Sequence, residues 1–463
     1  MISKLALRNV GPLPDREYRF GRRINALTGD NGLGKTFLLD LIWFAFSNEW
    51  PVFANPAMTT GNMARPARMD VKATLSYGIC PGSKTNGTLC RLEFDRESQQ
   101  WEGRGNNPKE TGCVVYSLSD GSFCVWDPIR NGRKQRNRPN YDPSLVVTPH
   151  EVWQGQQKFD RSNVGGSKTY STIQGIQADW MLWQTNPNSK ELPVLKQLLE
   201  KISPDGMPIG IGEPQKVSLE EARVMPTLRF PYGDVPINLA SAAFRRILTL
   251  AYILVWTYSE HVKASAFVGK KPTRRIVLLV DELDAHLHPK WQRMIMPTLL
   301  SAIETMVDSF GANDKPAEKP EVQIFTSTHS PLVMASLEDV FDAHTDKWFD
   351  FDFSGECREV CCEERPLVRI GGAEDWLRSV AFDLTSTRSK GMEQMLNIAA
   401  DKLQCVLEKC NEQIKVEDAV SDKSQERELR KIYSELAQRL SPTDSFLARF
   451  RLLCESRGWN VQR

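Results

Sequence analysis

The spacing of apolar residues changes along the chain, and each spacing predicts a different element. Residues 4–10 have the composition of a strand, and residues 22–46 predict a strand, a glycine-rich loop and an apolar helix. Between residues 69 and 127, short apolar runs separated by Gly, Asn and Ser predict an antiparallel layer of strands. The first part of the chain is therefore predicted to mix strands with one loop-and-helix unit.

Helical and strand-like patterns alternate in the rest of the chain. Apolar residues at helical spacing predict helices from about 175 to 200 and from 242 to 262, and a second strand-rich part is predicted from 274 to about 370. In the tail, apolar positions three and four residues apart mark one face of two amphipathic helices, at 392–414 and 429–440. We expect these two helices to fold as a hairpin.

Length, charge and hydropathy narrow the class of protein. A chain of 463 residues is too long for one core, so two or more lobes are expected. Its 59 basic and 58 acidic residues nearly cancel, which argues against general nucleic-acid or membrane binding and leaves only local patches. The apolar run 247–256 is shorter than the ~20 residues of a membrane span, and no signal peptide opens the chain. A soluble, cytoplasmic protein is expected, with no membrane partner.

The sequence GDNGLGKT completes the pattern GxxxxGK[ST] between a strand and a helix. Glycines let the backbone N–H groups approach a polyphosphate, and the helix directs its positive end at it. Lys35 would hold the β- and γ-phosphates, and Thr36 would place its hydroxyl on Mg²⁺. The nucleotide-binding residues predicted here are Gly29, Asp30, Asn31, Gly32, Leu33, Gly34, Lys35 and Thr36.

The stretch RRIVLLVDE supplies the acidic residues that ATP·Mg²⁺ requires beside such a loop. Its five apolar residues predict a buried strand, and Asp281 at the end of that strand would hold Mg²⁺. Glu282, the next residue, would act as general base on the attacking water. The sequence therefore predicts an ATP·Mg²⁺ site with Lys35 and Glu282 as catalytic residues.

Two transition-metal readings compete with this one. His286 and His288 could share a metal only on an extended backbone, whereas LDAHLHPKWQRMI predicts a turn into a helix. The cysteines at 357, 361 and 362 include two adjacent residues that would face opposite sides of a strand. With no paired CxxC motif, reduced thiols are expected throughout.

Three motifs in order, GDNGLGKT, DELDAHLHP and FTSTHSP, resemble those of ABC-type ATPases of the SMC, RecF and OLD branch. The resemblance implies that His329 is the switch histidine that reaches the γ-phosphate. It also implies that Asp284 lies in the loop that crosses to a partner subunit, and that the Leu-His-Pro stretch 287–289 is structural.

The same resemblance requires a signature motif, usually Leu-Ser-Gly-Gly-Gln, supplied by the opposing subunit. The candidate stretch is 240–246, where Ser241 would cap a helix and offer its hydroxyl to the γ-phosphate across a dimer. Both expected glycines are alanines and the glutamine is Phe244, which puts tight closure and fast turnover in doubt. An ordinary helix cap is the alternative.

A glutamine that couples Mg²⁺ to the helical lobe is also expected from the resemblance. We choose Gln154 as a third metal ligand beside Thr36 and Asp281, while Gln156, Gln157 and the glutamines of IQGIQADWMLWQ remain alternatives.

The implied fold is an α/β P-loop NTPase with an ABC/SMC-like head, in which a mixed sheet joins an antiparallel β layer, a helical signature lobe and C-terminal helices. The expected regions are lobe I at 1–175, the helical lobe at 176–265, lobe II with Asp281 and His329 at 266–390, and a C-terminal helical region at 391–463.

The resemblance implies an ATPase that uses ATP and Mg²⁺ and pairs two or more copies through its nucleotide sites. It is closest to stand-alone bacterial ATPases that accompany nucleases or other effectors in phage-defence systems such as Septu, PARIS and retrons; the stretch 371–389 is similar to a pattern found there. OLD nucleases carry a further Toprim metal site, for which 350–352 is the sole hint, so a separate effector protein is expected. The alternatives are a RecF- or SMC-like clamp on DNA and, less favoured, a transporter ATPase with a membrane subunit.

A basic loop at 127–142 leaves a contact with DNA open. Its charges could bind a phosphate backbone or line a solvated hairpin tip. The residues concerned are Arg130, Arg133, Lys134, Arg136 and Arg138, with Tyr141 close by.

Overall fold

The structure is a computed structural model of residues 1–463. It describes all of them except 81–87, 105–110, 133–143, 161–167, 205, 312–318, 355–358, 383, 385, 413–418, 442–443, 457–458, 460 and 462–463. The chain forms two compact units, Met1–Asp383 and Leu384–Arg463.

An eight-stranded mixed sheet forms the centre of the first unit. Its strand order is β20-β19-β3-β18-β17-β7-β8-β9. The strands from β19 to β7 are parallel, and antiparallel strands close both edges. In spatial order the strands are Glu359–Arg365, Lys347–Ser354, Ile24–Gly29, Glu321–Ser327, Arg275–Val280, Cys113–Ser117, Phe123–Trp126 and Leu145–Val147.

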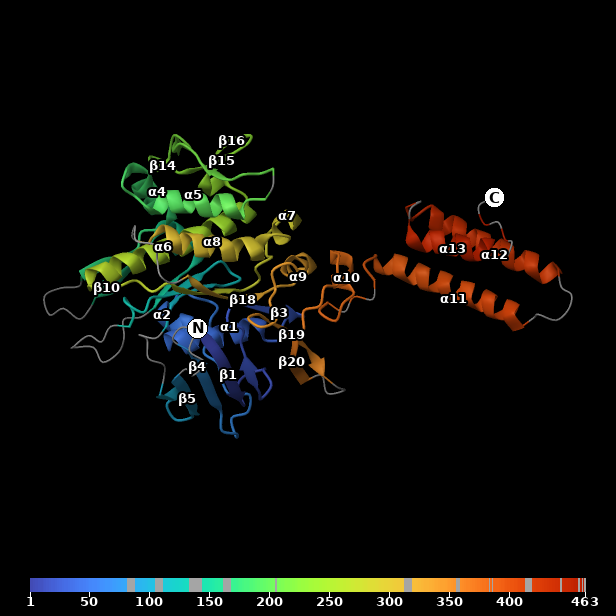
Figure 1. Ribbon diagram of the computed structural model, residues 1–463, viewed down its shortest axis with the longest axis horizontal. Helices are drawn as coiled ribbons and strands as arrows, with labels where there is room; N and C mark the ends of the chain where they lie inside the picture. Colours follow the sequence, from blue (N-terminus) through green and yellow to red (C-terminus); the bar gives the residue numbers. More distant parts are fainter. Residues whose placement is uncertain are drawn as a thin grey trace. The chain divides into compact units, whose positions relative to one another are not determined.

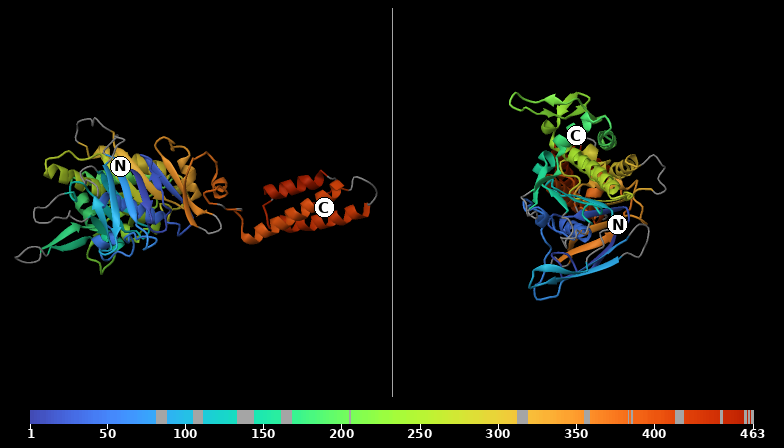
Figure 2. Two further views of the ribbon diagram at one scale, coloured as in Figure 1. Left: turned by 90° about the horizontal axis from the view of Figure 1, so that it is seen from below. Right: turned by 90° about the vertical axis from the view of Figure 1, so that its left-hand side faces the viewer.

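One face of this sheet is covered by α1 (Lys35–Ser47), which packs between it and a second sheet. That second sheet is antiparallel, with the order β2-β1-β4-β5-β6. Its strands are Glu17–Arg19, Ile2–Arg8, Thr74–Ile79, Thr88–Asp95 and Gln100–Arg104. Figure 1 shows α1 with β1, β4 and β5 on this side, and the right-hand view of Figure 2 shows the same layering.

The other face is covered by helices, chiefly α5, α6, α8 and α9. Residues of β17 alternate between the two cores, Ile276 and Leu278 on the helical side and Val277 and Leu279 beside α1, which explains the unbroken apolar run. The helices of this unit are α2 (Pro51–Ala54), α3 (Pro149–Gln154), α4 (Ile176–Thr185), α5 (Glu191–Ile202), α6 (Ala242–Phe267), α7 (Pro289–Gln292), α8 (Ile295–Ser309), α9 (Pro331–Leu337) and α10 (Ala373–Leu377).

Three small antiparallel sheets complete the first unit. They are β10-β11, β12-β15-β16 and β13-β14. The strands are Gln156–Asp160, Lys168–Ile173, Gly210–Ile211, Gln215–Lys216, Val224–Met225, Thr227–Phe230 and Gly233–Pro236, and a 3₁₀ turn, Ile237–Leu239, leads into α6. Within the described residues, no helix is long and apolar enough to cross a membrane.

The predicted α/β fold, with a mixed sheet, an antiparallel layer and helical parts, is confirmed. The predicted antiparallel layer at 69–127 is wrong in one respect, because β7 and β8 belong to the large sheet. Both faces of β7 are buried, and it pairs in parallel with β17. The part from 274 to 370 also contains α8, so it is less strand-rich than expected.

The described residues of the second unit form three helices where two were expected. They are α11 (Lys390–Glu412), α12 (Ala419–Ala437) and α13 (Ser445–Glu455). Leu447, Phe450 and Cys454 of α13 are buried in its small cores, so the hairpin gains a third partner. The division into four functional regions stays a prediction.

Candidate functional site

The glycine-rich loop joins β3 to the first turn of α1, as expected. Gly29 has φ 123°, and a Cβ there would lie 2.1 Å from the carbonyl oxygen of Phe351 on β19. Gly34 has φ 94° at the N-cap of α1, where a Cβ would lie 2.8 Å from Leu13. Side chains at these two positions would force the loop out of its shape.

Lys35 lies inside this loop. Its Nζ donates hydrogen bonds to the carbonyl oxygens of Gly29 at 2.8 Å and Asp30 at 2.7 Å. Burial lowers the pKa of Lys35, while the nearby carboxylates of Asp281 and Asp30 oppose that shift. Within the part of the chain that the structure describes, the ammonium is thus held at the loop by carbonyl oxygens rather than by an ion pair.

Asp281 and Thr36, the two firm metal-ligand predictions, lie next to each other. The Thr36 hydroxyl donates to Asp281 Oδ2 at 2.8 Å. The Ser327 hydroxyl, at the end of β18, donates to Asp281 Oδ1 at 2.6 Å. Because β3, β17 and β18 are parallel, their carboxyl ends bring the loop, the acidic residues and Ser327 to one edge of the sheet.

Glu282 follows directly and has a left-handed backbone, with φ 50°. Its N–H donates to the Ser327 hydroxyl at 2.7 Å, and its carbonyl accepts from Arg246 at 3.1 Å. Ser327 was not assigned a role from the sequence, and Arg246, in the predicted signature stretch, was expected to meet a phosphate, a carboxylate or a packing partner. The signal for Ser327 was its place at the end of an apolar strand, next to the predicted switch histidine.

His329 and Asp284 are joined through the start of the next loop. Asp284 Oδ1 accepts from the Thr328 hydroxyl at 2.6 Å and from the His329 N–H at 3.2 Å. Burial and the positive charge of Lys35 lower the pKa of His329. The structure therefore gathers Lys35, Asp284 and His329 at one place, while the crossing of Asp284 to a second subunit stays a prediction.

Ser241 occupies the N-cap of α6 and is exposed, but its side chain makes no capping hydrogen bond. Phe244, which replaces the expected glutamine, packs against Phe230 and Trp291, with ring centroids at 4.6 and 5.0 Å. The alternative of an ordinary side-chain cap finds no support in this geometry.

Gln154 ends α3, and its Oε1 accepts a hydrogen bond from Arg223 at 3.2 Å. No hydrogen bond among the described residues joins Gln154 to Thr36 or Asp281. Gln156, an alternative, is buried and donates to Val146 and Glu151. The choice of Gln154 as a metal ligand stays a prediction without geometric support.

The transition-metal reading of His286 and His288 gains nothing from the structure. His288 is the N-cap of α7, where its Nδ1 accepts from the Lys290 N–H at 3.2 Å. In the part of the chain that the structure describes, the one group of three side chains close enough to share an ion lies elsewhere, at Cys113, Asp127 and His261.

Hydrogen bonds already occupy the imidazole of that group. His261 Nε2 accepts the Thr273 N–H at 2.9 Å, so Nδ1 carries the proton and donates to Asp127 Oδ1, also at 2.9 Å. A metal on Nδ1 would require Nε2 to carry a proton that faces the Thr273 N–H. The group is therefore a structural contact between β7, α6 and the turn after β8.

The cysteines at 361 and 362 lie on opposite faces of β20, as expected for adjacent strand positions. Cys361 is half-buried and Cys362 is buried, and Cys357 lies outside the described residues.

Asp350, the first residue of the Asp-x-Asp stretch, accepts hydrogen bonds from Thr28 at 2.8 Å and from Arg365 at 2.8 Å. Its carboxylate is thus taken up by structural contacts.

The basic loop can be followed at one position. Arg130 pairs with Glu260 at 3.4 Å and lies over the ring of Trp256, 5.3 Å from its centroid. Arg133, Lys134, Arg136, Arg138 and Tyr141 lie outside the described residues, so a contact with DNA stays a prediction.

Comparison with protein families gives two matches. A family model described as "AAA domain, putative AbiEii toxin, Type IV TA system" matches residues 90–335, and a model described as "AAA domain" matches residues 4–169.

Curated proteins similar to the chain include one from Bacillus thuringiensis and one from Vibrio cholerae. Septu protein PtuA of Bacillus thuringiensis is 20% identical over 335 residues, which cover 72% of each protein. Retron Vc95 probable ATPase of Vibrio cholerae serotype O1 biovar El Tor is 36% identical over 61 residues, 13% of this chain and 9% of that protein. The first likeness spans most of both chains, whereas the second is confined to a short segment.

Solved structures give distant matches. An SMC head bound to the C-winged helix domain of ScpA aligns with a TM-score of 0.38 at 14% identity, covering 79% of this chain and 97% of that one. The recombination mediator protein RecF in the RecFOR pathway aligns with a TM-score of 0.34 at 10% identity, covering 75% and 95%.

Proposed function

The chain belongs to the AAA-domain family whose model matches residues 90–335, and from this premise we propose that it is a nucleotide-switched ATPase of a bacterial anti-phage defence complex. In this proposal ATP binding and hydrolysis control a separate effector, most simply a nuclease. The likeness to Septu protein PtuA and to a retron ATPase supports the defence context.

The observation that carries the ATPase proposal is the meeting of five groups at one edge of the sheet. Lys35, Thr36, Asp281, Glu282 and His329 come from three parallel strands and the loops that follow them. This is the set of charges that phosphoryl transfer to water requires, namely a cation on the phosphates, oxygen ligands for a metal, a base and a hydrogen-bond donor.

Thr36 and Asp281 fit Mg²⁺, because both offer oxygen ligands and Thr36 Oγ1 lies 2.8 Å from Asp281 Oδ2. When bound, Mg²⁺ would neutralise charge on the phosphates. Lys35 would exchange its two carbonyl partners for phosphate oxygens, which attract an ammonium more strongly.

Glu282 would orient a water molecule and accept its proton as the oxygen attacks the γ-phosphorus and the bond to the β-phosphate oxygen breaks. His329 would donate a hydrogen bond from one ring nitrogen to the γ-phosphate. Both residues act on charge that develops during the reaction, so their loss should lower turnover more than binding.

A second copy would complete each site. We propose that Ser241 and the first turn of α6 of one copy face the γ-phosphate bound to the other, because the hydroxyl is exposed and free of a capping bond. ATP would close the dimer and hydrolysis would open it, which gives the effector two states to distinguish.

The test is mass photometry of the Glu282→Gln variant with and without ATP·Mg²⁺. We expect the mass to double with ATP, because binding survives while hydrolysis stops. The Lys35→Ala/Glu282→Gln double variant is the matched control and should keep its starting mass. If Glu282→Gln binds ATP but its mass does not change, the cross-subunit site is contradicted.

The effector is tested by adding the product of the neighbouring gene to the same samples. A larger complex whose amount depends on ATP supports the defence proposal. ATP-dependent DNA binding that weakens with salt, with no such complex, would replace it with the DNA-clamp alternative.

A further inference from the structure

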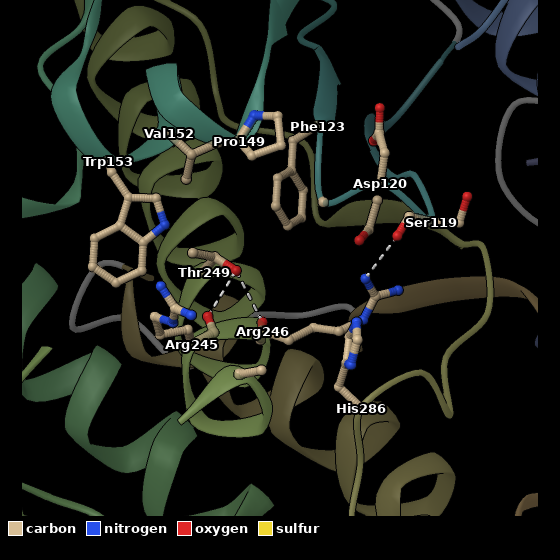
Figure 3. Close-up of a pocket in the computed structure, with 13 residues that line it drawn as sticks. Ser119, Asp120, Phe123, Pro149, Val152, Trp153, Arg245, Arg246, Thr249 and His286 are labelled. Atoms are coloured by element: carbon tan, nitrogen blue, oxygen red, sulfur yellow. Dashed lines mark hydrogen bonds between the residues drawn. The ribbon is translucent and has the colours of Figure 1, made fainter. Parts of the chain in front are cut away.

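Arg246 lies in the first turns of α6 and points to the end of β17. Its guanidinium donates hydrogen bonds to three backbone carbonyls, those of Asp281 at 2.9 Å, Glu282 at 3.1 Å and Ser119 at 3.4 Å. Figure 3 shows the contact with Ser119 as a dashed line. Among the described residues Arg246 forms no ion pair, so its guanidinium binds backbone carbonyls of the acidic pair instead of a carboxylate.

The backbone of Glu282 is held from both sides as a result. The Ser327 hydroxyl accepts its N–H, and Arg246 binds its carbonyl. The left-handed φ of 50° is uncommon for glutamate, so this backbone needs partners that hold it. A hydrogen bond from a charged donor is stronger than one from a neutral donor, and Arg246 supplies such a bond to this peptide.

We infer that Arg246 is a positioning residue that sets the direction of the Glu282 carboxylate by fixing the peptide that carries it. The inference rests on the proposed function of Glu282 as general base. A rotation of this peptide would move the carboxylate away from the attacking water, and small displacements of this kind cost large factors in rate.

The position of Arg246 also links two parts of the site. Ser241, proposed to face the nucleotide of a second copy, opens the helix that carries Arg246. If contact of Ser241 with that nucleotide shifted the start of α6, Arg246 would move with it and displace the Glu282 peptide of the same chain. Hydrolysis in one site would then depend on occupation of the other.

Arg245, the preceding residue on α6, differs from Arg246 in its geometry. Both arginines line a cavity of about 180 Å³, but Figure 3 shows the Arg245 guanidinium beside Trp153, away from Ser119. Arg245 is exposed, and within the described part of the chain its guanidinium has no hydrogen bond or ion pair. It has the same charge on the same helix without the contact to the acidic pair.

The experiment compares steady-state ATP turnover of Arg246→Gln, Arg246→Lys and, as a control, Arg22→Gln at an exposed arginine two residues before β3. We expect Arg246→Gln to lower kcat by about 10- to 100-fold, which is about 1.4–2.7 kcal/mol of activation free energy, with little change in KM. Arg246→Lys should fall between it and the wild type, because one ammonium could bond the carbonyls of Asp281 and Glu282 but would lose the second nitrogen that bonds Ser119. Arg22→Gln should stay within about twofold of the wild type.

A double-mutant cycle separates positioning from a general loss of structure. If Arg246 acts through Glu282, adding Arg246→Gln to Glu282→Gln should change the residual turnover by less than twofold, because the group it positions is already gone. A multiplicative loss would overturn the inference. It would also fall if Arg246→Gln turned over like the wild type, or if it lowered binding and thermal stability to the same extent as kcat.

Failure of the proposed function has a different outcome. A wild-type protein that binds ATP without hydrolysing it would remove the role of Glu282 itself. The inference about Arg246 is judged only on a wild type that hydrolyses ATP and loses turnover in Glu282→Gln.

Discussion

The glycine-rich loop and the first turn of α6 are the two surfaces proposed to meet ATP, and they are built in opposite ways. In the loop, the ammonium of Lys35 is buried and held by carbonyl oxygens of the same loop. At α6, Ser241 is exposed without a capping bond, and Leu239 just before it is 63% exposed. Lys35 of the loop is held by its own chain, whereas no capping bond within the described residues engages the Ser241 hydroxyl.

The two surfaces differ in the contacts that hold their backbone in place. Glycine sterics and neighbouring strands hold the loop, so its geometry exists before any ligand arrives. The start of α6 is held from behind, where Phe244 packs against Phe230 and Trp291 and where Arg246 binds backbone carbonyls. Its front side would be organised by contact with a second copy, which suits a switch better than a rigid site.

The substitution Lys35→Ala should have the largest effect on nucleotide binding by the glycine-rich loop. We expect ATP affinity to fall at least about 100-fold, because the variant loses a buried cation that binds phosphate oxygens. Isothermal titration calorimetry with ATP·Mg²⁺ measures this, with Lys196→Ala, an exposed lysine on α5, as the control. Retained affinity in Lys35→Ala would place the nucleotide elsewhere.

The substitution Ser241→Arg tests the proposed contact between the start of α6 and the nucleotide of a second copy. A bulky cation at the N-cap should block approach of a second copy, so ATP-induced dimerisation and most turnover are lost while ATP affinity changes by less than about threefold. Ser241→Ala should reduce turnover by only about tenfold, since the backbone N–H groups of the helix remain. Equal effects of both substitutions on ATP affinity would show that Ser241 acts within one chain.

The comparison is sharpened by Asp40, behind the loop on α1. Burial raises the pKa of Asp40 to about 8, although the Tyr116 hydroxyl donates to it at 3.0 Å. Because the folded state keeps this proton above the ordinary value of 3.8, stability falls by about 1.4 kcal/mol per pH unit between that value and about 8. Asp40→Asn removes this slope.

Urea unfolding at pH 6 and pH 8 measures the effect. The stability of Asp40→Asn relative to the wild type should rise by up to about 3 kcal/mol between the two pH values. Glu97→Gln, an exposed carboxylate, is the control and should show no such rise. An unchanged difference for Asp40→Asn would mean that the carboxyl is already ionised at pH 6.

Local pattern was sufficient wherever a feature depends on neighbours in the chain. The strand, loop and helix around Lys35, and the apolar strand ending at Asp281, follow from glycine sterics and from burial on both faces. The partners of β7 and β8 did not follow, because the same apolar run can pair with any strand whose faces are buried. Gln154 failed to gain support for a similar reason, since many glutamines precede α6 and spacing does not choose among them.

The sequence by itself determined the phosphate loop and the apolar strand that ends at the acidic pair, because each is a compact motif whose residues lie within a few positions of one another. The roles of the acidic pair and of His329 in ATP hydrolysis stay predictions. Only the tertiary structure decided that Ser327 and Arg246 hold the acidic pair from two sides, since both come from segments far away in the chain. Such contacts depend on the packing of β17 between β18 and α6, and no local spacing encodes that distance.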